Sequence, residues 1–367
     1  MIALLAAALT LPPDWAQPPD EPLPAIYEVG RQDPPEDHHS PVAHMYITRK
    51  AFEYYRARYP DTELGLFIDV TASGAHDEDK PWQNPFNEAW SIMRHFWDPT
   101  GSPTDGLWGS DSAVNRAHKY LTGGYGLDGA YDSDWGKKGT RGEGAVALHA
   151  KDKKTAYWYL GHMAHLLEDL TVPAHVQLWP HAMPKDRYET YMKHHHEKWD
   201  LPTSGPVEDY ANLLTLFRDT ALVTDRYDAG RNSAIGADGT VDQGRRRKGG
   251  FTDEELDEAA AVLAPLGVRR VAALYRFYYK QIDKQAPTVR LEILGGRLHA
   301  SAVDGLSGVD RLGYRYWALE GGQWIELARP EARPGAMVKA TAVDAAGNVG
   351  ESPVLIVGAG GLLGQSR

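Results

Sequence analysis

The stretch YLGHMAHLLEDLTVPAHV, residues 159–176, places three histidines and two acidic residues in one apolar run. His162, His165 and Asp169 are separated by three and four residues, so on a helix their side chains project from one face. Pro173 ends this helix or forces a turn, which lets His175 fold back toward the same face. A single histidine on an apolar helix face is usually a core residue, but the joint spacing H-x3-D-x5-H favours a metal site over a purely structural helix.

The composition limits what such a site contains. The chain has 367 residues, enough for two domains and at least one sizeable core. It has no cysteine and 15 histidines, so a metal must be held by histidine, carboxylate or backbone groups. The net charge of −11 gives no general attraction for nucleic acid or for an anionic membrane. Nucleic acid is therefore a disfavoured partner.

The chain begins with MIALLAAALTLPPDWAQPP, an apolar run of signal-peptide length that lacks a positively charged start. We interpret residues 1–37 as a signal-like segment followed by a disordered arm, and expect a secreted or periplasmic protein. The alternative is a disordered apolar N-terminus without an export role.

Hydrophobic periodicity predicts a mainly α protein with a β module at its end. Helical spacing is found at 43–59, 87–96, 112–121, 144–170, 188–199, 207–224 and 253–282. Beyond residue 285, short alternating segments are separated by glycine-rich turns, which is typical of strands in a small β-sandwich. We predict a multi-helix, metal-binding catalytic domain at 38–284, a sandwich at 285–357 as an accessory module, and a tail at 358–367.

The central run resembles the zinc-dependent phospholipases C, bacterial enzymes that cleave phosphatidylcholine, whose central helix follows Y-L-G-x3-H-x3-D-x3-P-x-H. The segment VAHMYITRKAF supplies His44 as the early histidine of that family. GAHDEDKPW and then RHFWDP supply Asp77 and His95, and RRVAALYRFYYK resembles the family's final amphipathic helix. The likeness covers about 40–282, whereas the β module resembles bacterial immunoglobulin-like or fibronectin-like modules ending in AVDAAGN.

This resemblance implies two to three zinc ions in the helical domain. Asp169 would bridge two of them, and Asp77 would act as a ligand or as the base that orients the attacking water. The implied ligands are His44, Asp77, His95, His165, Asp169, His175, His181 and Glu189.

Two features depart from the family pattern. Lys185 stands where the family has a histidine of the third zinc site, and His181 is the available substitute. Trp15 is further upstream than the N-terminal tryptophan that caps one zinc in the family, so His38 or His39 would replace it, or that metal would be missing.

The expected function is a secreted zinc-dependent phosphodiesterase that hydrolyses phospholipids by metal-activated water, with transient contact to a membrane surface. A zinc-dependent single-strand nuclease is the alternative enzyme, because it shares the fold and the cluster. A catalytically inactive, metal-stabilised surface or adhesion protein is the alternative of another class.

Overall fold

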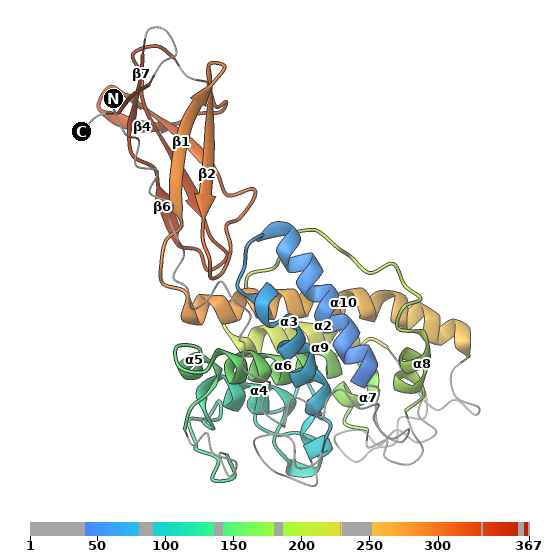
Figure 1. The fold of residues 1–367 in the computed structure, drawn as a ribbon. Coiled ribbons are helices and arrows are strands. Elements are labelled where there is room, and N and C mark those ends of the chain that lie inside the picture. Colours follow the sequence, from blue (N-terminus) through green and yellow to red (C-terminus); the bar gives the residue numbers. More distant parts are fainter. Residues whose placement is uncertain are drawn as a thin grey trace.

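A computed structural model of the chain describes residues 41–80, 91–135, 142–179, 186–227, 229, 252–331, 333–358 and 363–365. A helical region comes first, and an all-β region stands at one end of its last long helix (Figure 1). This order confirms the predicted fold class. The signal-like segment, His181 and Lys185 lie outside the described residues.

The helical region follows the predicted periodicity with four differences. Helix α3 was not predicted, the segment 207–212 is not helical, and the predicted helix 144–170 is divided in two. The division arises because Asp152 caps the second helix, its side chain accepting a hydrogen bond from the backbone nitrogen of Thr155. Of the predicted helix 87–96, residues 87–90 lie outside the described residues, and the described part holds only a short 3-10 helix. The described helices are α2 (Pro41–Arg58), α3 (Leu64–Asp77), η2 (Ser91–Arg94), η3 (Leu107–Gly109), α4 (Ala113–Thr122), α5 (Ala145–Leu148), α6 (Lys153–Asp169), α7 (Pro173–Val176), α8 (Arg187–His195), α9 (Leu213–Thr224) and α10 (Asp253–Ile282).

Helix α6 is the central helix and packs most closely against α3 (Figure 1). Two glycines make this crossing possible. A Cβ atom on Gly161 would lie 2.0 Å from the carbonyl oxygen of Thr71, and one on Gly74 would lie 2.1 Å from that of Trp158. The two backbones therefore touch, and the end of α3 lies beside the second half of α6, where the predicted metal ligands are.

The β region consists of two antiparallel sheets with a small apolar core between them. Strand β1 pairs with β2, and the second sheet has the order β4-β3-β5-β7-β8 with β6 beside β5. Alternate residues of β1 are buried, as the sequence pattern predicts. The strands are β1 (Thr288–Leu294), β2 (Arg297–Val303), β3 (Arg315–Glu320), β4 (Gln323–Glu326), β5 (Met337–Val343), β6 (Val349–Glu351), β7 (Leu355–Val357) and β8 (Leu363–Gln365).

Specific polar contacts join the two regions. The hydroxyl of Tyr55 on α2 donates to the carbonyl oxygen of Ser307 at 3.0 Å. Arg58, at the end of α2, donates through Nη2 to Oδ2 of Asp310 at 2.8 Å. In the loop that follows β5, the carbonyl oxygen of Ala345 accepts a hydrogen bond from Arg276 of α10 at 3.1 Å. The loops that follow β2 and β5 thus lie against α2 and α10.

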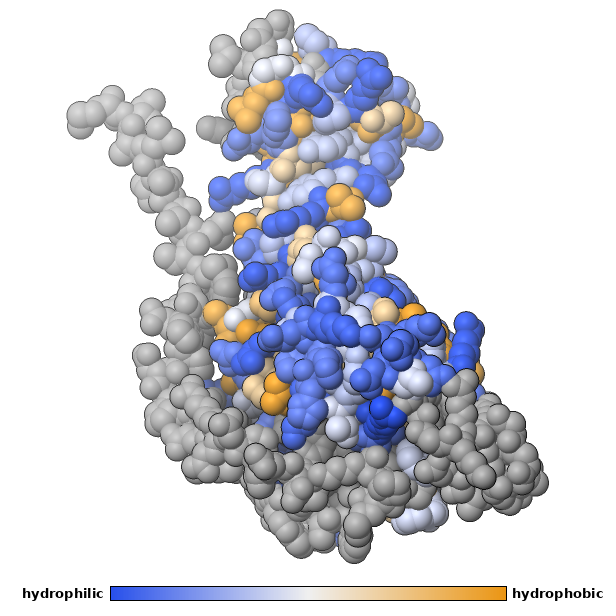
Figure 2. All heavy atoms as spheres, turned by 90° about the vertical axis from the view of Figure 1, so that its right-hand side faces the viewer, coloured by the Kyte–Doolittle hydropathy of each residue, from blue (hydrophilic) through white to orange (hydrophobic). Residues whose placement is uncertain are grey.

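On the face shown in Figure 2, the described surface is mostly hydrophilic, with apolar side chains scattered over it. None of the helices in the described ranges combines the length and the apolar character needed to cross a membrane.

Candidate metal centre

Helix α6 supplies His165 and Asp169, which lie at the middle of the candidate site and are both buried. Nε2 of His165 lies 3.1 Å from Oδ2 of Asp169, one helical turn further along. Nδ1 of His165 lies 2.5 Å from the carbonyl oxygen of Ala75 on α3. A carbonyl oxygen only accepts, so Nδ1 carries a proton, and Nε2 is the ring nitrogen that faces the site.

Two further histidines reach the same point from distant segments. His95 follows η2, and its Nδ1 lies 2.8 Å from Oδ2 of Asp169. His44, in the first turn of α2, stacks on His165 with ring centroids 4.0 Å apart. Its Nε2 lies 3.6 Å from Oδ1 of Asp169. The structure therefore brings together His44, His95, His165 and Asp169, four of the residues that the sequence selected.

Asp77 lies close by, but its carboxylate contacts other groups. Oδ2 accepts a hydrogen bond from Nε1 of Trp158 at 3.1 Å, and Oδ1 lies 3.0 Å from Nδ1 of His76 and 3.3 Å from Nζ of Lys80. Burial raises the pKa of Asp77, but His76, Lys80 and other polar neighbours outweigh it and lower this pKa. The side chain is thus held in a supporting network at the end of α3.

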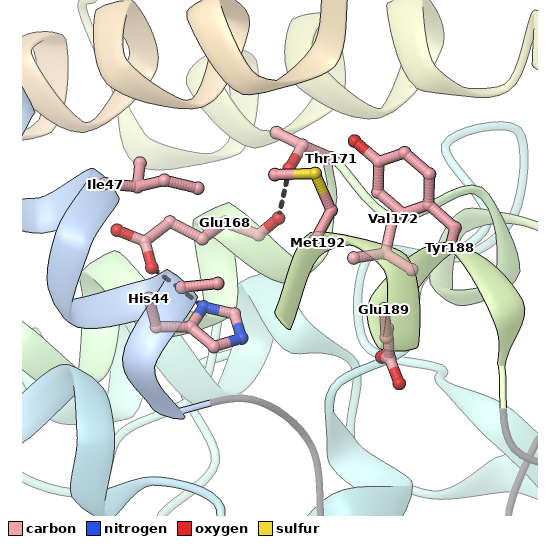
Figure 3. Close-up of a pocket in the computed structure, with 9 residues that line it drawn as sticks. His44, Ile47, Glu168, Thr171, Val172, Tyr188, Glu189 and Met192 are labelled. Atoms are coloured by element: carbon pink, nitrogen blue, oxygen red, sulfur yellow. Dashed lines mark hydrogen bonds and ion pairs between the residues drawn. The ribbon is translucent and has the colours of Figure 1, made fainter. Parts of the chain in front are cut away.

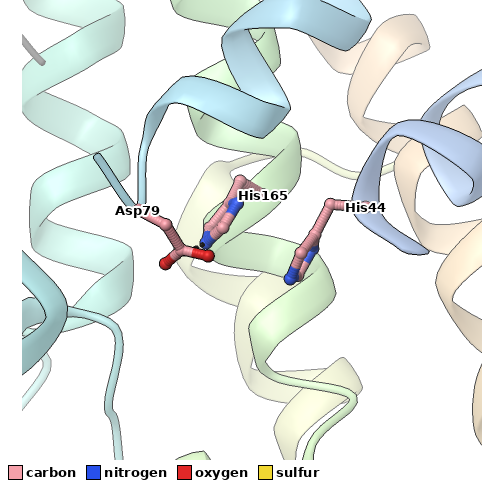
Figure 4. Close-up of side chains that lie close together, drawn as sticks. All are labelled: His44, Asp79 and His165. Atoms are coloured by element: carbon pink, nitrogen blue, oxygen red, sulfur yellow. Dashed lines mark ion pairs between the residues drawn. The ribbon is translucent and has the colours of Figure 1, made fainter. Parts of the chain in front are cut away.

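Asp79, two residues further along, directs its carboxylate into the site instead. Its Oδ1 lies 3.4 Å from Nε2 of His165 and 3.5 Å from Nδ1 of His95. Ligand atoms of His44, Asp79 and His165 all lie within 4.8 Å of one another (Figure 4). The segment DED contains both aspartates, so its pattern alone does not tell which one turns inward after α3 ends. We refer to His44, Asp79, His95, His165 and Asp169 as the histidine–carboxylate cluster.

One carboxylate oxygen of Asp169 lies close to the imidazole rings of three histidines. Its Oδ2 is near ring nitrogens of His95, His165 and His175, the last at 3.7 Å. None of these contacts has hydrogen-bond geometry, so this buried oxygen has no hydrogen-bond partner among the described residues. Burial raises the pKa of Asp169, but the surrounding imidazoles outweigh it and hold this pKa well below its usual range. A buried carboxylate oxygen that lies near several imidazole nitrogens without a hydrogen bond to any of them fits a bound cation.

His175 and Glu189 form a second pair beside the cluster. His175 lies on the short helix α7 that begins at Pro173, as the predicted turn requires. Its Nε2 is 2.8 Å from Oε1 of Glu189 on α8. His181, the remaining residue predicted for this third site, lies outside the described residues, and so does Lys185.

Glu168 is a polar neighbour that the sequence analysis did not select. Its Oε2 lies 2.8 Å from Nδ1 of His44, and its Oε1 accepts a hydrogen bond from the hydroxyl of Thr48 at 2.8 Å. Burial raises the pKa of Glu168. The carboxylate accepts the Nδ1 proton, which turns Nε2 of His44 toward Asp169. The sequence signal for Glu168 was its position next to Asp169. Helical spacing, however, places adjacent residues on different faces of α6, so it did not select Glu168.

His162 belongs to a separate buried network under the cluster. Its Nδ1 lies 2.6 Å from Oε2 of Glu78, which also pairs with Arg116. Burial raises the pKa of Glu78, but Arg116 and the histidines outweigh it and lower this pKa well below its usual range. This network holds the buried carboxylate of Glu78 in place.

A mostly apolar pocket opens next to His44, between α2, α6 and α8 (Figure 3). Ile47, Val172 and Met192 line it, together with Glu168 and Glu189. The pocket therefore offers an apolar surface directly beside candidate metal ligands.

No protein-family model matches the sequence, and no curated protein matches it. Among solved structures, the alpha-toxin of Clostridium absonum is similar with a TM-score of 0.47 and 15% identity, over 90% of this chain and 86% of that chain. The alpha-toxin of Clostridium perfringens, avian strain SWCP, has a TM-score of 0.46 and 13% identity, over 83% and 88%. Neither likeness assigns a role to any residue of this chain.

Proposed function

We propose that this protein is a zinc-dependent phosphodiesterase of the phospholipase C type, which hydrolyses phospholipids by attack of a metal-activated water. The observation that carries the proposal is the convergence of four separate segments on Asp169, in the order in which the zinc-dependent phospholipases C place their ligands. Imidazole and carboxylate are the ligands that Zn²⁺ takes when cysteine is absent.

The proposed ligands of two neighbouring zinc ions are the members of the histidine–carboxylate cluster. We assign to Asp79 the role that the sequence analysis proposed for Asp77, because the Asp79 carboxylate faces His95 and His165. His175, Glu189 and His181 are proposed for a third ion. When bound, such ions act as Lewis acids on the phosphate and lower the pKa of a bound water to about 7.

The chain's own groups prepare this site for metal and substrate. The carbonyl oxygen of Ala75 fixes the tautomer of His165, and Glu168 fixes that of His44, so both Nε2 atoms face Asp169. The pocket beside His44 is mostly apolar, but its volume of about 30 Å³ admits only one or two water molecules. Based on the signal-like segment 1–37, we also propose that the protein is secreted or periplasmic and contacts membrane surfaces transiently.

Metal content and substrate class are tested together on the full chain. Elemental analysis of metal-replete protein should find two to three zinc ions, and less than one transition metal per chain would contradict the proposal. Phosphatidylcholine vesicles and a soluble chromogenic phosphodiester should be hydrolysed, and a chelator should abolish both activities. Hydrolysis of single-stranded DNA alone would assign the site to a nuclease, and zinc binding without any hydrolysis would indicate a structural protein.

A further inference from the structure

Three aspartates meet where the helical region joins the β region, far along the chain from the histidine–carboxylate cluster. Asp283 directly follows α10, Asp304 follows β2, and Asp344 follows β5. Each offers a carboxylate oxygen, and these oxygens all lie within 4.8 Å of one another. The residues are only 2%, 7% and 2% exposed, respectively. We refer to them as the aspartate cluster.

Basic side chains do not compensate this concentration of negative charge. Within the ranges that the structure describes, no lysine, arginine or histidine lies in ion-pair distance of the aspartate cluster. Arg276 is at the same junction, but its guanidinium donates to the carbonyl oxygens of Ala345 and Val207 at 3.1 and 3.0 Å. Three buried carboxylates without a counter-ion are costly, because desolvation and mutual repulsion act together.

Hydrogen bonds hold the carboxylates in place but leave part of their capacity unused. Oδ1 of Asp304 accepts from the backbone nitrogens of Leu306 and Ser307 at 2.7 and 3.1 Å. Both carboxylate oxygens of Asp344 accept from Asn348, at 2.8 and 2.9 Å. These bonds come from loop backbone and one amide, so they orient the acids without neutralising them.

Asp283 supplies an independent sign of a missing ligand. Its Oδ1 accepts from the backbone nitrogen of Gln285 at 3.0 Å, but its buried Oδ2 has no hydrogen-bond partner among the described residues. The hydroxyl of Ser307, in the loop of Asp304, is also buried and has no hydrogen bond to any residue that the structure describes. Burial, with repulsion from the other two acids, raises the pKa of Asp304 to about 6. The site therefore favours positive charge at its centre.

We propose that Asp283, Asp304 and Asp344 bind one Ca²⁺ ion that fastens the β region to the end of α10. Oxygen-only ligands with high negative charge select a hard cation, and Ca²⁺ takes oxygens at about 2.3–2.6 Å. Two oxygens on opposite sides of such an ion are up to about 5 Å apart, which the observed spacing satisfies. The three carboxylates come from three segments and repel one another. A cation between them would attract all three and so hold the segments together.

The test uses full-length protein that has been freed of calcium with EGTA, reloaded with zinc and dialysed into buffer without chelator or calcium. Titration with CaCl2, followed by calorimetry, should show one site per chain and should raise Tm, whereas MgCl2 should bind more weakly. Asp304→Asn keeps an oxygen that accepts from the loop backbone but removes the charge. We expect it to weaken calcium binding by at least about tenfold. Without calcium it should be no less stable than the wild type, because the repulsion is relieved.

Asp310→Asn is the matched control, since Asp310 is a nearby junction carboxylate that pairs with Arg58 instead. It should keep its calcium affinity within about twofold, even if its Tm is lower. Absence of calcium binding in the wild type would overturn the proposal. Equal loss of binding in Asp304→Asn and Asp310→Asn would also overturn it, because the effect would then follow the stability of the junction.

Discussion

The histidine–carboxylate cluster and the aspartate cluster both gather acidic groups from distant segments, but they balance charge differently. In the first, three imidazoles surround Asp169, and its pKa falls well below the usual range. In the second, no basic side chain of the described residues pairs with the carboxylates, and burial with their mutual repulsion raises the pKa of Asp304 to about 6. The two clusters differ in ligand chemistry rather than in the number of acids. Imidazole with carboxylate suits a borderline-soft catalytic ion, whereas carboxylates alone suit a hard structural ion.

The largest effect is expected when the charge of Asp169 is removed, because the position of this charge among imidazoles distinguishes the first cluster from the second. Asp169→Asn keeps the size of the side chain, but two adjacent dications would lose their shared anion and repel each other. We expect loss of at least one zinc ion and a fall in phosphodiesterase activity by several orders of magnitude. Zinc content and turnover of the soluble phosphodiester, measured on the same preparation, check this.

His162→Ala, on the same face of α6, is the control for that change. It should keep the zinc content but lose about 1–3 kcal/mol of unfolding free energy, because buried Glu78 loses a hydrogen bond. Full zinc content and near-normal turnover in Asp169→Asn would mean that the residues on α6 are structural.

The next largest effect should separate Asp79 from Asp77. Asp79→Asn removes a carboxylate that faces His165 and should lower both zinc content and turnover. Asp77→Asn should keep zinc, because that side chain is bonded to Trp158, and should instead destabilise the fold by about 1–3 kcal/mol. The opposite result, zinc loss only in Asp77→Asn, would restore the assignment made from the sequence.

Those two aspartates mark the limit of what the sequence determines. Helical periodicity predicted α2, α4 and α10, and the spacing of His165 and Asp169 predicted one shared face, since both rest on local geometry. The orientation of Asp77 and Asp79 depends on where α3 ends, and α3 itself was not predicted. Its tight crossing with α6 relies on two glycines that are far apart in the sequence.

The aspartate cluster was beyond sequence reasoning for a related reason. Asp283, Asp304 and Asp344 each sit at the end of a different element and share no periodic spacing. Loop aspartates are common turn residues, so each has an ordinary local explanation. Only the packing of the two regions brings the three carboxylates together.

A smaller effect is expected from Glu168, a positioning residue that acts through His44. Glu168→Gln removes the charge that accepts the Nδ1 proton of His44, and should weaken zinc binding by about 10- to 100-fold. Competition with a chelator measures this, and turnover at saturating zinc should change much less than the affinity. Thr48→Val, which removes only the hydroxyl donor to Glu168, should have a weaker effect of the same kind. Equal zinc affinity in Glu168→Gln and the wild type would exclude a positioning role.

The smallest effect on chemistry should come from the junction, where Asp310→Asn removes half of an ion pair with Arg58. The pair is partly buried, so its loss should lower the unfolding free energy by about 1–3 kcal/mol, measured by urea denaturation. Turnover of a soluble phosphodiester should not change, because Asp310 and Arg58 lie at the junction and do not contact the histidine–carboxylate cluster. If turnover falls while zinc content stays constant, the junction influences the catalytic geometry. The two clusters would then have to be treated as coupled parts of one site rather than as independent metal centres with separate tasks.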